Sequence, residues 1–356
     1  MRYLYLPLAL LGGYMFLFSS LCAEQGVRLD ALHKAGFFPE GAPVRYTYLH
    51  IPVVDAVLQY LVSFFYEFVD GSNPDSRVFA IYFLLVIAPV FGIWAVETSR
   101  GSGRLLLPWT LAMQLTGCCT AAPLFYFLHS SRTSPSSPSS PSSPSSPSLP
   151  PSRARALAPA LFLSYVLPTL LMFLPLSPPH LQAAIAVWQA FPLWFTLSHS
   201  ALTNLTHLTH LAHFYSRAGT EDPRRERAYV DRVYTLVSLV SAGAHLYLLR
   251  YVLADPNPWE RVKAVFWPRW EVETVAQASA IMLGGDWWIS LLATVAWGVG
   301  GVWGQMEGGK GWGRKLAVMG AVVAAAVMIS PGVVVAECWR WREGRLRERA
   351  AGKKRV

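Results

Sequence analysis

The chain has 356 residues, of which 53% are hydrophobic and only 14% charged, and its formal net charge is +9. A soluble globular domain carries about 25% charged residues. The composition therefore excludes an ordinary soluble protein, a disordered chain and a small disulfide-bonded scaffold, and it indicates a multi-pass membrane protein.

Nine apolar runs approach or exceed the length of about 20 residues that a helix needs to cross a bilayer. We expect an all-α, multi-pass transmembrane helix bundle of about eight or nine helices that forms one integral-membrane domain over residues 1–356. The first run also has features of a signal peptide, but its length favours a retained helix. The runs cover residues 4–22, 49–69, 78–96, 105–128, 156–176, 181–202, 230–253, 275–303 and 316–336.

Two segments fall outside the apolar pattern. Residues 131–152 are a Pro-Ser-Ser repeat, which predicts a flexible loop. Residues 339–356 form a basic tail, which predicts an anchor at the membrane surface; since no DNA or RNA motif accompanies it, we expect no nucleic-acid partner. With nine crossings and a cytoplasmic tail, the Arg-rich loop 215–229 would lie on the far side, against the positive-inside rule. Either the helix count is off by one or one run is re-entrant.

Asp286 is the clearest polar group inside an apolar run. It lies eleven residues past Val275, about 17 Å along a helix and near the middle of the bilayer. A buried ionisable group there is costly, so a functional role is favoured over a simple hydrogen bond between helices. Gly284 and Gly285 beside it allow another helix or a ligand to approach closely.

Two further acids stand near the ends of apolar runs. On position alone, Glu97 is an interfacial acid paired with Arg100 three residues later. Asp55 shares a helix face with Gln59, Ser63 and Tyr66, and this polar stripe either lines a cavity or joins helices.

The histidines at 199, 207, 210 and 213 follow one another closely, and those at 207, 210 and 213 are spaced three residues apart. This His199–His213 cluster can be interpreted as a metal site or as the interfacial end of a helix; we favour the second interpretation and expect no metal.

Aromatic residues cluster near the acids. Trp94 precedes Glu97 by one turn, and Trp287 follows Asp286. Trp188 and Trp194 lie in one short segment. Membrane tryptophans commonly form interfacial belts, whereas ring faces inside a cavity stabilise cations. The depth of Trp287 favours the second role for that residue.

Several catalytic classes lack their motifs. The chain has no phosphate-binding loop, no dinucleotide-binding glycine pattern, no H-E-x-x-H and no Asp-rich pair that would hold magnesium on a diphosphate. What remains is an apolar cavity with buried carboxyl groups and aromatic faces. A neutral acid in such a cavity can donate its proton to an epoxide or an alkene, and the walls would shield the resulting carbocation. This is acid-initiated polyene cyclisation.

The sequence resembles the fungal integral-membrane terpene cyclases of meroterpenoid biosynthesis over about residues 50–295. The matching segments are Asp55-x-x-Leu58, Val62-Ser63-Phe64-Phe65, Asp70-Gly71-Ser72, Trp94-x-x-Glu97-x-Ser99-Arg100, Pro123-Leu124-Phe125-Tyr126-Phe127-Leu128-His129, Tyr165-Val166-Leu167-Pro168-Thr169, Trp188-Gln189-x-Phe191-Pro192-Leu193-Trp194, Ser241-Ala242-x-x-His245 and Asp286-Trp287. The departures are the Pro-Ser repeat and the Gly-rich stretch 298–313.

The resemblance implies a membrane-bound terpene cyclase that needs no metal and no cofactor. Glu97 and Asp286 fall where the family has its acids, which makes them the expected catalytic residues, and Asp55, Trp94, Trp188, Trp194 and Trp287 are the expected substrate-binding residues. The implied substrate is a prenylated, farnesyl-bearing aromatic or polyketide compound, and the expected location is the lipid bilayer of the endoplasmic reticulum. The alternative hypothesis is a proton-coupled small-molecule transporter or exporter, because buried aspartates also relay protons.

Overall fold

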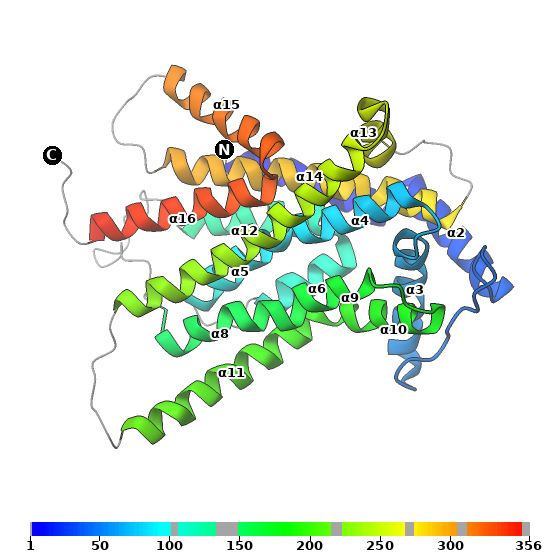
Figure 1. Cartoon of the computed structure of the whole chain (residues 1–356), viewed down its shortest axis with the longest axis horizontal. Coiled ribbons are helices and arrows are strands. Elements are labelled where there is room, and N and C mark those ends of the chain that lie inside the picture. Colours follow the sequence, from blue (N-terminus) through cyan, green and yellow to red (C-terminus); the bar gives the residue numbers. More distant parts are fainter. Residues whose placement is uncertain are drawn as a thin grey trace.

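The computed structural model describes residues 2–100, 106–132, 149–214, 223–267, 274–304 and 312–350, and these are almost entirely helical (Figure 1). Beside the helices they contain one isolated β-bridge, between Phe37 and Pro43. The expected all-α fold is therefore confirmed. The helices are α1 (Tyr5–Leu17), α2 (Ser20–Ala35), α3 (Pro52–Val69), α4 (Pro74–Val86), α5 (Ala88–Arg100), α6 (Leu106–Thr116), α7 (Cys118–Arg132), α8 (Pro151–Leu161), α9 (Leu167–Met172), α10 (Pro178–Gln189), α11 (Phe191–Phe214), α12 (Pro223–Leu253), α13 (Pro258–Phe266), α14 (Val275–Trp303), α15 (Trp312–Met328) and α16 (Pro331–Ala350), with a 3-10 turn at Arg2–Leu4 and a π-helical turn at Phe162–Val166.

Six helices in the described part of the chain are long and apolar enough to cross a membrane, counting helices that continue into one another as one. They coincide with six of the nine predicted runs, so the expected helix count is close. They are Tyr5–Ala35, Pro52–Val69, Pro74–Arg100, Pro151–Met172, Arg225–Leu253 and Val275–Trp303.

The other three runs are each broken into two helices. The run 105–128 breaks at Gly117, whose φ of 77° is a left-handed conformation that glycine adopts at little cost. The run 181–202 breaks at Ala190, ahead of Pro192, and the run 316–336 breaks at Ser330, ahead of Pro331. A proline in the following helix has no N–H to bond back, so it favours a break at these points.

α6 and α7 form a hairpin whose tip is Gly117. The Trp109 ring of α6 lies 5.5 Å from that of Phe125 in α7, so the two helices run back along each other. At the tip, the backbone N–H of Cys119 donates to the Asp286 carboxylate, 2.5 Å away, in the middle of α14. The hairpin therefore enters the bundle and turns back inside it.

α16 is held against the bundle by a buried ion network. The guanidinium of Arg100 donates to both carboxylate oxygens of Glu343, each at 2.5 Å, and also to Glu97, at 3.1 Å. The indole of Trp339 donates to Glu97 at 2.9 Å. The basic residues from 339 to 350 thus continue helix α16, and some of them pack against α5 and α12.

α1 packs closely on α7 and α14 through glycines. A Cβ on Gly12 would lie 2.6 Å from the backbone oxygen of Cys119, and one on Gly285 would meet the Met15 sulfur. Such close approach is what small residues permit between helices in a membrane. α1 therefore rests directly on the first turn of α7, beside the Asp286 contact.

We expect Gly12→Ala to force α1 away from α7 and to lower the free energy of unfolding by about 1–3 kcal/mol, because the new methyl group meets backbone and not a movable side chain. The matched control is Gly13→Ala, whose methyl group would find its nearest atom, on Thr120, at an ordinary 3.7 Å. Thermal unfolding of the purified protein in detergent measures both. Equal midpoints for the two variants would contradict the close packing.

Glu343→Gln should lower the free energy of unfolding by about 3–5 kcal/mol, because it leaves the buried Arg100 guanidinium without its bidentate partner. The control on the same helix is Glu348→Gln, which removes an exposed pair with Arg345 and should change stability by about 0.5 kcal/mol or less. A similar thermal midpoint for both variants would show that the network does not hold α16.

Candidate active site

The candidate site is a cavity inside the bundle, with about 790 Å³ of free space including its open mouth. Its walls are predominantly apolar, and Asp286 is the one carboxyl group on them. The lining residues are Phe16, Cys22, Tyr60, Leu61, Phe64, Phe65, Phe83, Leu84, Ile87, Met113, Gln114, Leu115, Gly117, Cys118, Trp188, Met282, Leu283 and Asp286.

Three helix breaks surround the cavity. α1 gives way to α2 at Phe18 and Ser19, next to the lining residues Phe16 and Cys22. The α6–α7 tip approaches from another side, and a Cβ on Gly117 would lie 2.8 Å from the Phe16 ring. The tip is joined to the break between α10 and α11, because the Gln114 amide donates to the Gln189 carbonyl at 3.0 Å. Interrupted helices inside membrane proteins are tolerated where they are buried or line a cavity.

Asp286 projects from the middle of α14 and is 3% exposed. Its Oδ1 accepts from the Cys119 N–H at 2.5 Å and from the Ser290 hydroxyl at 3.2 Å. Cys119 is in the first turn of α7, where unpaired N–H groups and the helix dipole favour a carboxylate nearby. The apolar walls oppose a full charge in the same place. The side chain thus joins the hairpin tip to α14 and lies on the cavity surface.

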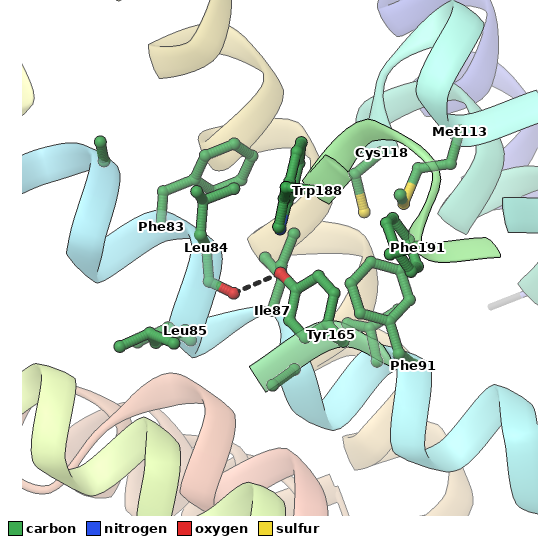
Figure 2. Close-up of a cluster of buried hydrophobic side chains, with 14 of the residues drawn as sticks. Phe83, Leu84, Leu85, Ile87, Phe91, Met113, Cys118, Tyr165, Trp188 and Phe191 are labelled. Carbon is green, nitrogen blue, oxygen red and sulfur yellow. Dashed lines mark hydrogen bonds between the residues drawn. The ribbon is translucent and has the colours of Figure 1, made fainter. Parts of the chain in front are cut away.

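The aromatic side of the cavity is ordered by its own hydrogen bonds. The Trp188 indole donates to the Thr169 hydroxyl at 2.9 Å, and its ring lies 5.4 Å from that of Phe65. The Tyr165 hydroxyl donates to the Leu84 carbonyl at 2.5 Å, which fixes α4 against the π-helical turn that contains Tyr165 (Figure 2). Trp188, Phe83 and Ile87, which are labelled in Figure 2, all line the cavity. Fixed ring faces of this kind can stabilise a cation.

Two of the predicted site residues, Asp286 and Trp188, line the cavity together. The other tryptophans lie elsewhere. Trp94 is fully buried and stacks on Phe125, Trp287 packs on Tyr82 beside a separate small pocket, and Trp194 is 41% exposed and donates to the Val187 carbonyl. None of these three lines the main cavity.

The remaining predicted acids have structural partners of their own. Asp55 accepts from the backbone N–H groups of Tyr48 and Leu49, at 2.8 and 2.7 Å, so it fixes the loop before α3. Glu97 belongs to the ion network of α5 and α16 and does not line the cavity. His129 contributes to that network, with its Nε2 3.4 Å from Glu97. The structure therefore does not bring Glu97 and Asp286 to a common surface.

Sequence reasoning did not identify many of the residues that line the cavity, in particular Tyr60, Phe64, Phe83 and Gln114. Phe64 stood in one of the matching segments, and Tyr60 lies near the expected polar stripe on α3, but neither had been assigned to the cavity. Phe83 and Gln114 had no local signal, because only the fold turns them toward Asp286.

In the described residues, no group of three or more His, Cys, Asp or Glu side chains is arranged to hold a metal ion. His199 lies 3.2 Å from the Arg153 carbonyl. The side chains of the other three clustered histidines, at 207, 210 and 213, lie outside the described residues, as do residues 133–148 of the Pro-Ser repeat.

Comparison with known proteins gives two relatives and one family. The chain is 24% identical over 265 residues to terpene cyclase ascI of Acremonium egyptiacum, covering 69% of this chain and 65% of the relative. It is 28% identical over 218 residues to terpene cyclase ctvD of Aspergillus terreus, covering 58% and 61%. The matches thus span less than two thirds of either relative.

No solved structure matches the chain significantly. The model of the CtvD domain family, by contrast, matches residues 1–346, nearly the whole chain. The chain belongs to the CtvD domain family.

Proposed function

We propose that this protein is a membrane-bound terpene cyclase that starts cyclisation with a proton from Asp286 and needs no metal. The observation that carries the proposal is the position of that single carboxyl group on an aromatic-walled apolar cavity inside the bundle. The names of the two relatives support the same activity.

In the proposed reaction, neutral Asp286 transfers its proton either to an epoxide oxygen, whose C–O bond then breaks, or to a terminal alkene carbon. Both steps leave a cationic carbon, and the π electrons of the next double bond attack it to close a ring. Loss of a proton from the last cation, or attack on that cation by a hydroxyl group of the substrate with release of the hydroxyl proton, ends the sequence, and the released proton returns to the Asp286 carboxylate. The apolar walls favour the neutral acid, and the rings of Phe65 and Trp188 would stabilise the cations.

The proposed substrate is a farnesyl-bearing aromatic or polyketide compound. The prenyl chain would lie against the aromatic walls with its reactive end at Asp286. The proposed location is the endoplasmic reticulum membrane, in keeping with the six helices of sufficient length.

The broken helices suggest a solution to the orientation problem. In Figure 1, α1–α2, α4–α5, α8–α9, α10–α11, α12 and α14 run along the length of the bundle, whereas α3 runs across it. α6–α7 and α15–α16 are hairpins that return to the end from which they start: His129 of α7 lies beside Glu97 near the end of α5, and Lys315 of α15 lies over the Trp303 ring at the end of α14. The six crossings would then be five of the six helices of sufficient length, without α3, together with the broken pair α10–α11. They would place the start of α1 and the end of α16 on one side.

The bundle end at which α5 and α16 finish and α8 and α12 begin, here called the basic end, carries most of the positive charge. By the positive-inside rule we assign it to the cytosol. This places the arginines in the first turns of α12 on the same side as the end of α16. The described cations at the basic end are Arg100, Arg153, Arg155, Arg225, Arg227, Arg314, Lys315, Arg340, Arg342, Arg345 and Arg347.

Asp286→Asn should lower cyclised product at least about 100-fold, because asparagine still accepts from the Cys119 N–H but has no acidic proton to give. Product formed from a farnesylated phenol in membranes is the measurement. Ser290→Ala is the control, since it removes a hydrogen bond to Asp286 and leaves the acid. Glu97→Gln should lose product only in proportion to the folded protein it loses. Undiminished product from Asp286→Asn would refute the assignment.

The orientation can be checked by glycosylation mapping in a variant that first removes the natural acceptor sequence with Asn204→Gln. An acceptor sequence inserted at the exposed Gly41, in the segment between α2 and α3, should be glycosylated, because that segment lies at the opposite end of the bundle from the basic residues. One appended to the C-terminus should stay unmodified. The reverse pattern would overturn the proposed orientation.

A further inference from the structure

The side chains that line the cavity are exposed on one side of it and buried on the opposite side. Leu115 on α6 is 67% exposed and Tyr60 on α3 is 39% exposed, while Phe16 and Cys22 are half-buried. Opposite them, the lining residues contributed by α4, α7, α10 and α14 are all buried, Asp286 among them. The cavity therefore has a mouth between α1–α2, α3 and the tip of α6, and a closed floor at Asp286.

Much of the rim of this mouth is apolar, although α2 also carries the charged residues Glu24, Arg28 and Asp30. Phe18 next to α1, Leu111 on α6 and Val57 on α3 are all exposed. Among the described residues that line the cavity, Asp286 at the floor is the one Asp, Glu, Lys, Arg or His. The tip of α6–α7 is at the depth of Asp286, the twelfth of the 29 residues of α14. An exposed apolar rim at that depth is suited to contact with acyl chains and not with water.

We propose that the substrate reaches the cavity sideways from the bilayer, through a lateral portal bounded by Phe16, Cys22, Tyr60 and Leu115. This inference rests on the proposed function. The prenyl chain goes in first and reaches Asp286, and the polar head stays at the mouth beside the phenol of Tyr60. The substrate class follows: an uncharged prenylated compound that partitions into membranes.

The same geometry excludes a free prenyl diphosphate as the substrate. Moving a multiply charged group through hydrocarbon costs many kilocalories unless cations pair with it. In the part of the chain that the structure describes, no lysine, arginine or histidine lines the cavity to provide that pairing. The diphosphate must therefore have been displaced earlier, by a prenyl-transfer reaction that joins the chain to its aromatic or polyketide head.

Leu115→Trp tests the portal by filling its mouth. In vesicles supplied with a farnesylated phenol, kcat/KM should fall about tenfold while kcat changes less, because access is hindered and the floor is untouched. Leu197→Trp is the matched control: Leu197 lies on α11, is 61% exposed and does not line the cavity, so kcat/KM should stay within about twofold. Equal effects of the two variants would overturn the portal.

A second measurement separates binding from chemistry. One variant combines Leu115→p-benzoylphenylalanine with Asp286→Asn, so that cross-linking reports binding of the substrate without its conversion. This variant is irradiated in the presence of an alkyne-tagged farnesyl phenol. Cross-linking at position 115 should exceed that at position 197 at least about tenfold, untagged farnesyl phenol should compete, and farnesyl diphosphate should not. Equal cross-linking at the two positions refutes the portal, and competition by the diphosphate refutes the uncharged substrate class. Neither result depends on whether Asp286 is the acid.

Discussion

The contact between the Asp286 carboxylate and the first turn of α7 is the constraint on which the centre of the molecule depends. A helix that begins inside an apolar bundle exposes N–H groups that have no partner in its own backbone. Without water, an acceptor must come from another helix. Asp286 provides it to Cys119 at 2.5 Å, and Gly12 of α1 packs closely on the same turn.

This contact gives one carboxyl group two tasks. As an acceptor it holds the tip of α6–α7 against α14, and as a surface group of the cavity it faces the proposed substrate. The two tasks are compatible because a carboxyl group has two oxygens, and a neutral acid can accept at one while it donates from the other. The hydrogen bond also fixes the acid relative to Trp188 and Phe65, so the donor and the ring faces keep one geometry through the reaction.

Sequence reasoning predicted the helical bundle and Asp286, because length of apolar runs and depth within a run can be read directly from residue order. It failed where the direction of a side chain decides. Trp287 is adjacent to Asp286 in the chain, yet successive residues point about 100° apart on a helix, and it packs on Tyr82 away from the cavity. Glu97 looked catalytic beside Trp94, but its partners on α16 come from more than two hundred residues away. The hairpin at Gly117 was not visible either, since a single glycine in an apolar run is common.

The position of Glu97 has a physical reason in the proposed chemistry. A carbocation is captured by a nucleophile or base within reach, so a cavity that guides one is favoured when carboxylates other than the acid itself, and free amines, lie away from its walls. The buried charged residues and the cavity lie at different positions along the length of the bundle. Charged groups that dock α16 are gathered with Arg100 at the basic end, paired with one another, while the described lining of the cavity has one carboxyl group, Asp286, at its floor. Because the ion network lies away from the cavity, the bundle can bury charged residues in its core while its cavity has almost no charged residues on its walls.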